Sequence, residues 1–105
     1  MMRLDRYEKN EEVLVDVIEC SDDALIATSM ACRTVDVSEE GMKVALGMPV
    51  PISSRLGLRL DFTDSLYRLE GEVRWFNQDG YVGLELDEDS PDFVNWIRMF
   101  ELDLM

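Results

Sequence analysis

The stretch Leu66-Tyr-Arg-Leu-Glu-Gly-Glu-Val-Arg-Trp-Phe76, followed by Asn77-Gln-Asp-Gly80 and Tyr81-Val-Gly-Leu-Glu-Leu-Asp87, decides the fold of this chain. Apolar and charged residues alternate along both long segments, which is typical of strands that bury one face and expose the other. The Asp-Gly pair between them favours a tight turn, because glycine accepts the positive φ that such turns need. The two segments are therefore predicted to pair as an antiparallel hairpin. The predicted core face of the first segment comprises Tyr67, Leu69, Val73 and Trp75.

The same alternation extends toward the N-terminus. Arg55–Phe62 places three leucines and a phenylalanine on one face and charged residues on the other. Shorter apolar segments in the first half predict strands at Val13–Ile18, Ala31–Val37 and Met42–Leu46. Between the first two, the segment 20–30 starts with a turn signal, and its second part is either a short strand or an ordered loop.

The end of the chain changes from a period of two to a helical period. Ser90 is a favourable N-cap and Pro91 suits the first helical position, so a helix is predicted from Pro91 to about Glu101. Its aromatic face is expected to pack against the core. The residues on that face are Phe93, Trp96, Ile97 and Phe100, which recur at spacings of three and four.

Together these elements predict a mainly β fold. It is a small antiparallel β-barrel of six or seven strands, a split barrel, with a C-terminal α-helix across one opening. Closure into a barrel removes exposed strand edges. The 105 residues are enough for one core and are assigned to a single domain. Its parts are an N-terminal arm at residues 1–11, the barrel at 12–87 and the helix at 90–103.

Composition excludes several classes of function. The formal net charge of −13 argues against binding to nucleic acid or to an anionic membrane surface. Histidine, the commonest general base and metal ligand at neutral pH, is absent from the sequence. We therefore expect no enzymatic activity, no catalytic residue, no metal site and no cofactor. The acidic run Asp87–Asp89 with Asp92 is interpreted as a solvated strand end.

Location and assembly follow from a few further features. No segment has the length and hydrophobicity of a membrane helix or a secretory signal, which predicts a cytoplasmic protein without membrane insertion. Cys20 and Cys32 are then expected to stay reduced and to act as small apolar residues. The apolar residues Leu102, Leu104 and Met105 either pack back on the barrel or contribute to a homodimer, and the sequence leaves the oligomeric state open.

The most specific short segment is Asp36-Val-Ser-Glu-Glu-Gly-Met42, at the junction of two predicted strands. Asp36 and Ser38 are two residues apart, so on a regular strand their side chains point to the same face. Gly41 is expected to adopt a turn conformation that is closed to other residues. A carboxylate and a hydroxyl beside backbone N–H groups are able to bind a polar ligand, but the same residue types also serve simply to stabilise a turn.

The pattern of Asp36, Ser38 and Gly41 resembles the D/N-x-S-x-x-G motif of PilZ domains, which are bacterial signalling modules. The resemblance covers about residues 31 to 103. It implies the β-barrel of that family and a binding or regulatory role. Members typically bind cyclic di-GMP, a bacterial second messenger, and this motif holds a guanine and nearby groups. The resemblance continues in order through Met42–Val44, Leu58–Phe62, Gly71–Trp75, Tyr81–Leu86 and the final helix.

The second motif of the family, R-x-x-x-R, precedes the first strand, and its arginines clamp phosphates. Here Arg6 matches the first arginine, but Asn10 stands at the position of the second. Arg3 and Lys9 lie nearby in the sequence, interleaved with carboxylates. On a regular strand Arg33 points away from the face of the first motif, so we do not expect it to replace the missing arginine.

Two hypotheses follow from this resemblance. In the first, the chain is a regulatory binding module of cyclic di-GMP signalling that acts as a protein–protein adaptor with a degenerate nucleotide site. In the second, it is a genuine receptor that binds cyclic di-GMP, as a ligand and not as a cofactor. The residues implied for that site are Asp36, Ser38, Gly41, Arg6 and Arg3.

Overall fold

The computed structural model describes residues 7–62 and 64–103, with side chains up to residue 101. The segment 20–30, which the sequence left open, contains a short 3₁₀ helix and then the start of a long strand. The elements are β1 (Tyr7–Glu8), β2 (Glu12–Glu19), η1 (Asp23–Leu25), β3 (Ser29–Val37), β4 (Gly41–Ala45), β5 (Arg55–Phe62), β6 (Ser65–Phe76), β7 (Tyr81–Leu86) and α1 (Phe93–Asp103).

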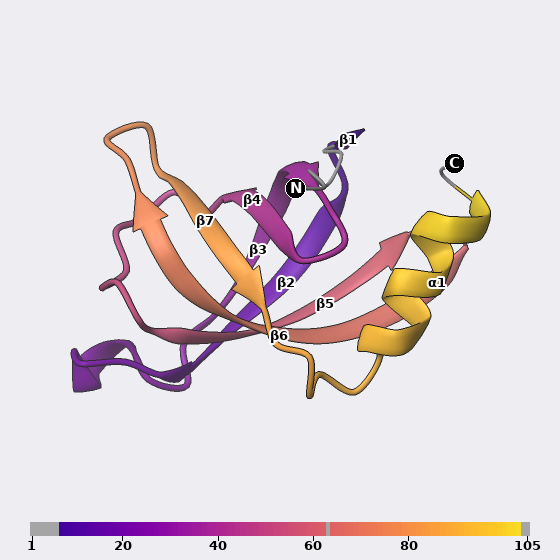
Figure 1. Cartoon of the computed structure of the whole chain (residues 1–105). Helices are drawn as coiled ribbons and strands as arrows, with labels where there is room; N and C mark the ends of the chain where they lie inside the picture. Colours follow the sequence, from indigo (N-terminus) through magenta and orange to yellow (C-terminus); the bar gives the residue numbers. More distant parts are fainter. Residues whose placement is uncertain (1–6, 63, 104–105) are drawn as a thin grey trace, which may run out of the picture.

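The strands form one antiparallel sheet that closes on itself. Their order is β1-β3-β2-β5-β6-β7-β4, and an additional pairing of β3 with β4 completes a six-stranded barrel. The short β1 is an extra strand that pairs with the end of β3. Figure 1 shows α1 at one end of the barrel and the β6–β7 hairpin at the opposite side. The predicted antiparallel barrel with a C-terminal helix is confirmed.

The period of two determines which side chains fill the barrel. On β2, Val13, Val15 and Val17 are at most 2% exposed, and each lies opposite a buried leucine of β5. Full burial of such side chains stabilises the fold by roughly 1.5–3 kcal/mol each. The interior of a barrel of this size is filled by its own residues, which leaves the outer surface for binding. The leucines of β5 are Leu56, Leu58 and Leu60.

An irregularity in the β6–β7 hairpin changes the orientation of Trp75. Gly80 in the connecting turn has a φ of 83°, as the Asp-Gly signal predicts. The pairing register then shifts between Val73 and Trp75, so that Arg74 is an extra residue in β6. Trp75 consequently lies opposite Gly83 and is 41% exposed. The prediction that Trp75 belongs to the core face is wrong, because one inserted residue inverts the period of two.

Helix α1 begins at Phe93, two residues later than the predicted start at Pro91. Ser90 uses its hydroxyl to hold the preceding loop against β6 instead of capping the helix. The backbone N–H of Glu70 donates to Ser90 Oγ at 2.8 Å, and Ser90 Oγ donates to the carbonyl of Asp87 at 2.6 Å and lies 3.1 Å from the carbonyl of Glu70. The predicted N-cap residue therefore anchors the connection between β7 and α1 to the barrel.

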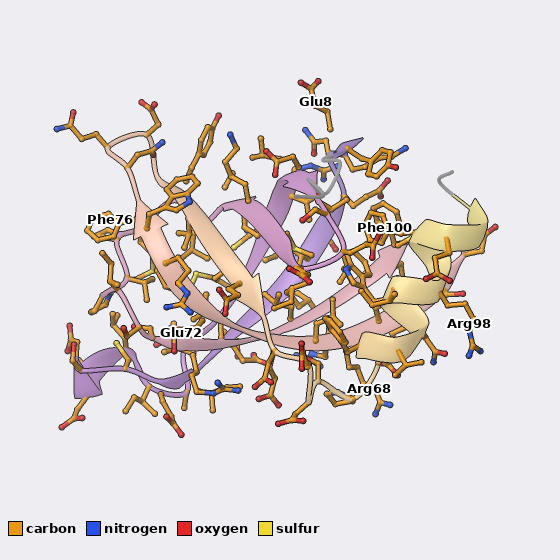
Figure 2. All side chains as sticks on the ribbon, viewed as in Figure 1. Glu8, Arg68, Glu72, Phe76, Arg98 and Phe100 are labelled. Carbon is orange, nitrogen blue, oxygen red and sulfur yellow. The ribbon has the colours of Figure 1, made fainter. Side chains whose placement is uncertain are left out.

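Asp92 links the first turn of α1 to β6. Its carbonyl accepts the N–H of Trp96 at 2.9 Å, which is the first turn of the helix. Its carboxylate accepts the backbone N–H of Arg68 at 2.7 Å and Arg68 Nε at 3.1 Å. The hydrogen bond from the Arg68 side chain, followed by the one from its backbone, lowers the pKa of the Asp92 carboxyl. Figure 2 shows Arg68 beneath α1, where this contact is made.

Trp96 closes the end of the barrel. It is completely buried, and three aromatic rings surround it edge-on at centroid distances of 5.1 to 5.6 Å. Its indole N–H donates to the carbonyl oxygen of Ser38 at 3.1 Å. The aromatic face predicted for the helix therefore packs in the core, as Figure 2 shows for Phe100. The surrounding rings belong to Phe62, Tyr67 and Phe100.

Replacing Trp96 with phenylalanine tests the importance of the indole hydrogen bond. Trp96→Phe keeps an aromatic ring but leaves the buried carbonyl of Ser38 without its donor. We expect a loss of about 1–3 kcal/mol in the free energy of unfolding, measured by urea denaturation. The control is Val94→Ala on the exposed side of the same helix, where Val94 is 66% exposed and little change is expected. Equal stabilities for the two variants would contradict this account.

The lowered pKa of Asp92 predicts a pH dependence of stability. Since ionised Asp92 is favoured in the folded state, its contribution is fully present above the ordinary carboxyl pKa. It is lost as the pH falls through the lowered value. We expect Asp92→Asn to be less stable than the wild type near neutral pH and to lose less stability on acidification. Urea midpoints measured from about pH 7 to about pH 2 would check this, with Asp61→Asn on the exposed face of β5 as the control.

Candidate functional site

Ser38 closes the turn between β3 and β4 with its side chain. Gly41 N–H donates to Ser38 Oγ at 3.1 Å, and Ser38 Oγ donates to the carbonyl of Gly41 at 3.2 Å. The backbone N–H of Ser38 donates to the same carbonyl at 2.9 Å. Ser38 is only 4% exposed, and its own carbonyl accepts the bond from Trp96. The serine of the motif is therefore engaged within the protein at its hydroxyl, its N–H and its carbonyl.

Gly41 differs from its expected role. Positive φ angles occur at Gly47 and Gly80 among the glycines that the structure describes, so Gly41 does not occupy the left-handed region. It is the first residue of β4, is buried, and pairs with Glu85 of β7. The prediction of a conformation closed to other residues is wrong here. Gly41 lies at a buried point where the turn between β3 and β4 meets β7.

Asp36 lies on the outside of the barrel at the end of β3. Its Oδ2 atom is 3.6 Å from Nζ of Lys43, its partner across the β3–β4 pair. The same ammonium lies 5.6 Å from the centre of the Tyr81 ring on β7. An ion pair and a cation–π contact thus connect three strands on one outer face. Lys43 is shared between a carboxylate and an aromatic ring.

A bulge in β3 brings Arg33 to the same outer face as Asp36. The register against β4 shifts between Thr34 and Asp36, so that Val35 is an extra residue. Thr34 remains buried, whereas Arg33 is exposed. Arg33 Nε donates to Oδ1 of Asn10, and Arg33 Nη2 donates to the carbonyl of Asn10 at 2.8 Å. The expectation that Arg33 points away from the motif is wrong, because β3 is not a regular strand.

Two hollows meet on this face. One of about 610 Å³ is lined in part by Asp36, Ser38 and Gly41, so the structure brings these three motif residues together. The adjoining hollow, of about 800 Å³, shares Asp36 with it. Further residues of the first hollow include Lys43, Arg74 and Trp75. Further residues of the second include Lys9, Asn10, Arg33, Lys43 and Tyr81.

Arg74 and Trp75 are members of this face that sequence reasoning missed. Arg74 forms ion pairs with Glu72 at 2.9 Å and with Glu85 at 3.0 Å, and its hydrogen bond to Glu85 is the main reason that its pKa is raised. Arg74 is the extra residue of the bulge in β6 and Trp75 follows it, and a bulge carries no sequence signal of its own. Lys43 was also missed, although its outward position on β4 follows from the period of two.

Four residues to which the sequence assigned a role lie outside the described part of the chain. They are Arg3 and Arg6, which were predicted to bind a nucleotide, and Leu104 and Met105 at the other end. The remaining predicted site residues are placed as above. Cys20 and Cys32 are both free thiols, and burial raises the pKa of Cys32.

The acidic run after β7 is held by hydrogen bonds. Asp87 accepts the backbone N–H of Asp89 at 2.9 Å and Arg55 Nη2 at 2.7 Å, and these bonds, in that order, lower the pKa of Asp87. Across residues 7–62 and 64–103, no group of carboxylates and cysteines is arranged to hold a metal ion. Over the same residues, no helix has the length and apolar character needed to span a membrane. The cytoplasmic location stays a prediction.

Comparison with known proteins places this chain in a family. The sequence profile of the PilZ domain matches residues 6–100. Among solved structures, the PilZ domain of CeSA from a cellulose-synthesizing bacterium aligns with a TM-score of 0.71 at 16% sequence identity, covering 95% of this chain and 97% of that one. At that identity the structural likeness supports the fold alone. A search of curated protein sequences finds no significant match. Because the profile spans most of the sequence, the chain belongs to the PilZ domain family, a family of cyclic di-GMP-binding modules.

Proposed function

We propose that this PilZ domain is a protein–protein adaptor of cyclic di-GMP signalling whose nucleotide site is degenerate. The observation that carries the proposal is the engagement of Ser38 inside the protein. Its hydroxyl both accepts from and donates to Gly41, and its carbonyl receives the Trp96 indole. A ligand would have to compete with these buried bonds, which cost about 1–3 kcal/mol when left unmade. In this chain Ser38 and Gly41 of the motif stabilise the turn between β3 and β4.

The charges around the motif also favour an adaptor. Asp36 faces Lys43, so a phosphate that approached this lysine would meet the carboxylate already paired with it. Glu40 and Glu85 line the same hollow. At contact distance salt screens such charges incompletely, and a doubly anionic ligand is therefore repelled. The net charge of −13 adds to this repulsion over longer distances.

The family position of the second motif arginine is occupied by Asn10. An amide lacks the positive charge and the planar pair of donors that make arginine suitable for a phosphate. Losing one such contact commonly costs a few kcal/mol, which is enough to move a micromolar affinity out of a useful range. A binding module that has lost its small ligand still retains its surface, so a protein partner is the remaining occupant.

One observation favours a second function, that of a genuine cyclic di-GMP receptor. Arg33 lies on the outer face through the bulge of β3, and its guanidinium is bound to Asn10 by two hydrogen bonds. An arginine from a neighbouring strand therefore stands beside the position where the motif lacks one. Its hydrogen-bond partners among residues 7–62 and 64–103 are uncharged oxygens. In this alternative, Arg33 supplies the second phosphate contact, together with Asp36, Ser38, Gly41 and the N-terminal arginines Arg3 and Arg6.

Isothermal titration calorimetry with cyclic di-GMP separates the two functions. For the wild-type chain we expect no measurable heat and no thermal shift at high micromolar nucleotide, because the serine is engaged and the carboxylates repel the ligand. Differential scanning fluorimetry on the same samples is the independent measurement. A dissociation constant near micromolar that Asp36→Ala abolishes would instead establish the receptor.

If the nucleotide does bind, Arg33→Ala tests whether Arg33 supplies the second phosphate contact. In the receptor, this variant should weaken binding about tenfold or more, since a charge-assisted contact to phosphate is lost. Arg98→Ala is the matched control, because Arg98 points away from the barrel on α1, as Figure 2 shows. It removes the same charge far from the motif. Equal losses in the two variants would show that only the net charge matters, which contradicts a role for Arg33.

A further inference from the structure

We propose that the outer face of β4, β6 and β7 is a docking groove for a partner segment that carries an arginine or lysine side chain. Trp75 provides the aromatic surface beneath that cation. The inference deepens the adaptor function proposed above and rests on it. Two hollows of about 610 and 510 Å³ lie along these strands. They share Glu40, Arg74 and Glu85, so they form one continuous groove.

The position of Trp75 in this groove is fixed by its neighbours. A Cβ atom added at Gly83 would lie 2.1 Å from Trp75 Nε1, so the indole occupies the space that any other residue would fill with its side chain. The bulge at Arg74 prevents the ring from turning into the core. Trp75 is nevertheless 41% exposed. One part of the ring is therefore supported by the sheet while the rest opens into the groove.

The charges of the groove define the chemistry of its partner. Seven acidic and three basic residues line it. Each basic residue already has an acidic partner in the groove: Lys43 pairs with Asp36, Arg74 with Glu72 and Glu85, and Arg55 with Asp87. Three exposed carboxylates have no ion pair within the described chain. They are Glu40, Glu88 and Asp89.

A cationic side chain fits both the exposed ring of Trp75 and the carboxylates that have no ion pair within the described residues. The face of an indole attracts a guanidinium or ammonium group, and exposed tryptophans are frequent anchors of interfaces. The fold already uses this attraction nearby, where Lys43 Nζ lies 5.6 Å from the centre of the Tyr81 ring. Carboxylates around the ring favour the same charge.

Other occupants fit this groove less well. A purely apolar partner would bury unpaired carboxylates, which is costly. Nucleic acid, or any other polyanion, would be repelled. A second copy of the chain would bring another net charge of −13 against the groove. A basic segment of a different protein is therefore the occupant that the charges select.

The test uses the 105-residue chain, labelled with nitrogen-15, and a synthetic peptide as the probe. The probe carries two arginines and one lysine separated by glycine and serine, and the control peptide carries glutamine at those three positions. We expect the basic peptide to shift the indole N–H resonance of Trp75 and the backbone resonances of Gly83–Glu85 and Gly41–Lys43. The glutamine peptide should leave these resonances unchanged.

Variants then identify the residues responsible. Trp75→Ala should weaken binding of the basic peptide roughly threefold to tenfold. The double variant Glu40→Gln/Glu88→Gln should weaken binding and reduce its dependence on salt, and it decides the question if Trp75→Ala does not fold. Leu66→Ala is the matched control, because Leu66 is 58% exposed on β6 but lines a separate hollow with Leu14. Its affinity should equal that of the wild type.

Three results would overturn the groove. They are the absence of binding by the basic peptide, resonance shifts centred on other strands, and an affinity of both groove variants equal to that of Leu66→Ala. Failure of the adaptor function is a different result, because it would appear as micromolar binding of cyclic di-GMP in calorimetry. If neither the nucleotide nor the basic peptide binds, the proposed adaptor function still stands, and the proposed docking groove is rejected.

Discussion

The hydrogen bond from the Trp96 indole to the carbonyl of Ser38 connects α1 to the turn between β3 and β4 at the end of the barrel. Trp96 belongs to α1, its ring packs against Phe62 and Tyr67 at the end of the barrel, and Ser38 is in the turn of the motif. A buried carbonyl needs a donor, and a buried indole N–H needs an acceptor, so neither group is left unsatisfied. The helix cannot move away from the barrel without breaking this bond to the turn, so the motif serine has a structural role in this chain.

Elements that keep a regular period could be predicted from the sequence, whereas the orientation of residues beyond a bulge could not. The hairpin at Gly80, the strand Arg55–Phe62 and the aromatic face of the helix all follow from local patterns. The outward positions of Trp75 and Arg33 did not follow, because the extra residue Arg74 precedes Trp75, and the extra residue Val35 lies between Arg33 and Asp36. A bulge depends on how the backbones of two strands pair, so it cannot be predicted from the sequence of one strand alone.

The same two bulges determine the character of the outer face. If β3 paired regularly through Val35, Arg33 and Asp36 would lie on opposite faces, and if β6 paired regularly through Arg74, Trp75 would share the core face of Val73. Both changes place a residue that is suited to binding onto a surface that the alternating pattern alone would assign differently. The family fixes the barrel and the position of the motif, but the chemistry of the face depends on these residues of the individual chain.

Ion pairing on this face makes its response to charge asymmetric. An anion that binds at Lys43 must separate it from Asp36, and it must do so beside Glu40, so the cost of the broken pair reduces the gain of the new contact. A cation requires no such exchange, because Glu40 and Glu88 are exposed and have no ion pair within the described residues, and Trp75 lines the same hollow as Glu40. Most of the discrimination comes from the carboxylates that are not neutralised by an ion pair, because they repel an anion and attract a cation. In this protein each basic residue of the groove is already paired with a carboxylate, whereas Glu40, Glu88 and Asp89 are not paired with a base in the described part of the chain. The groove therefore favours a basic partner over an anionic ligand.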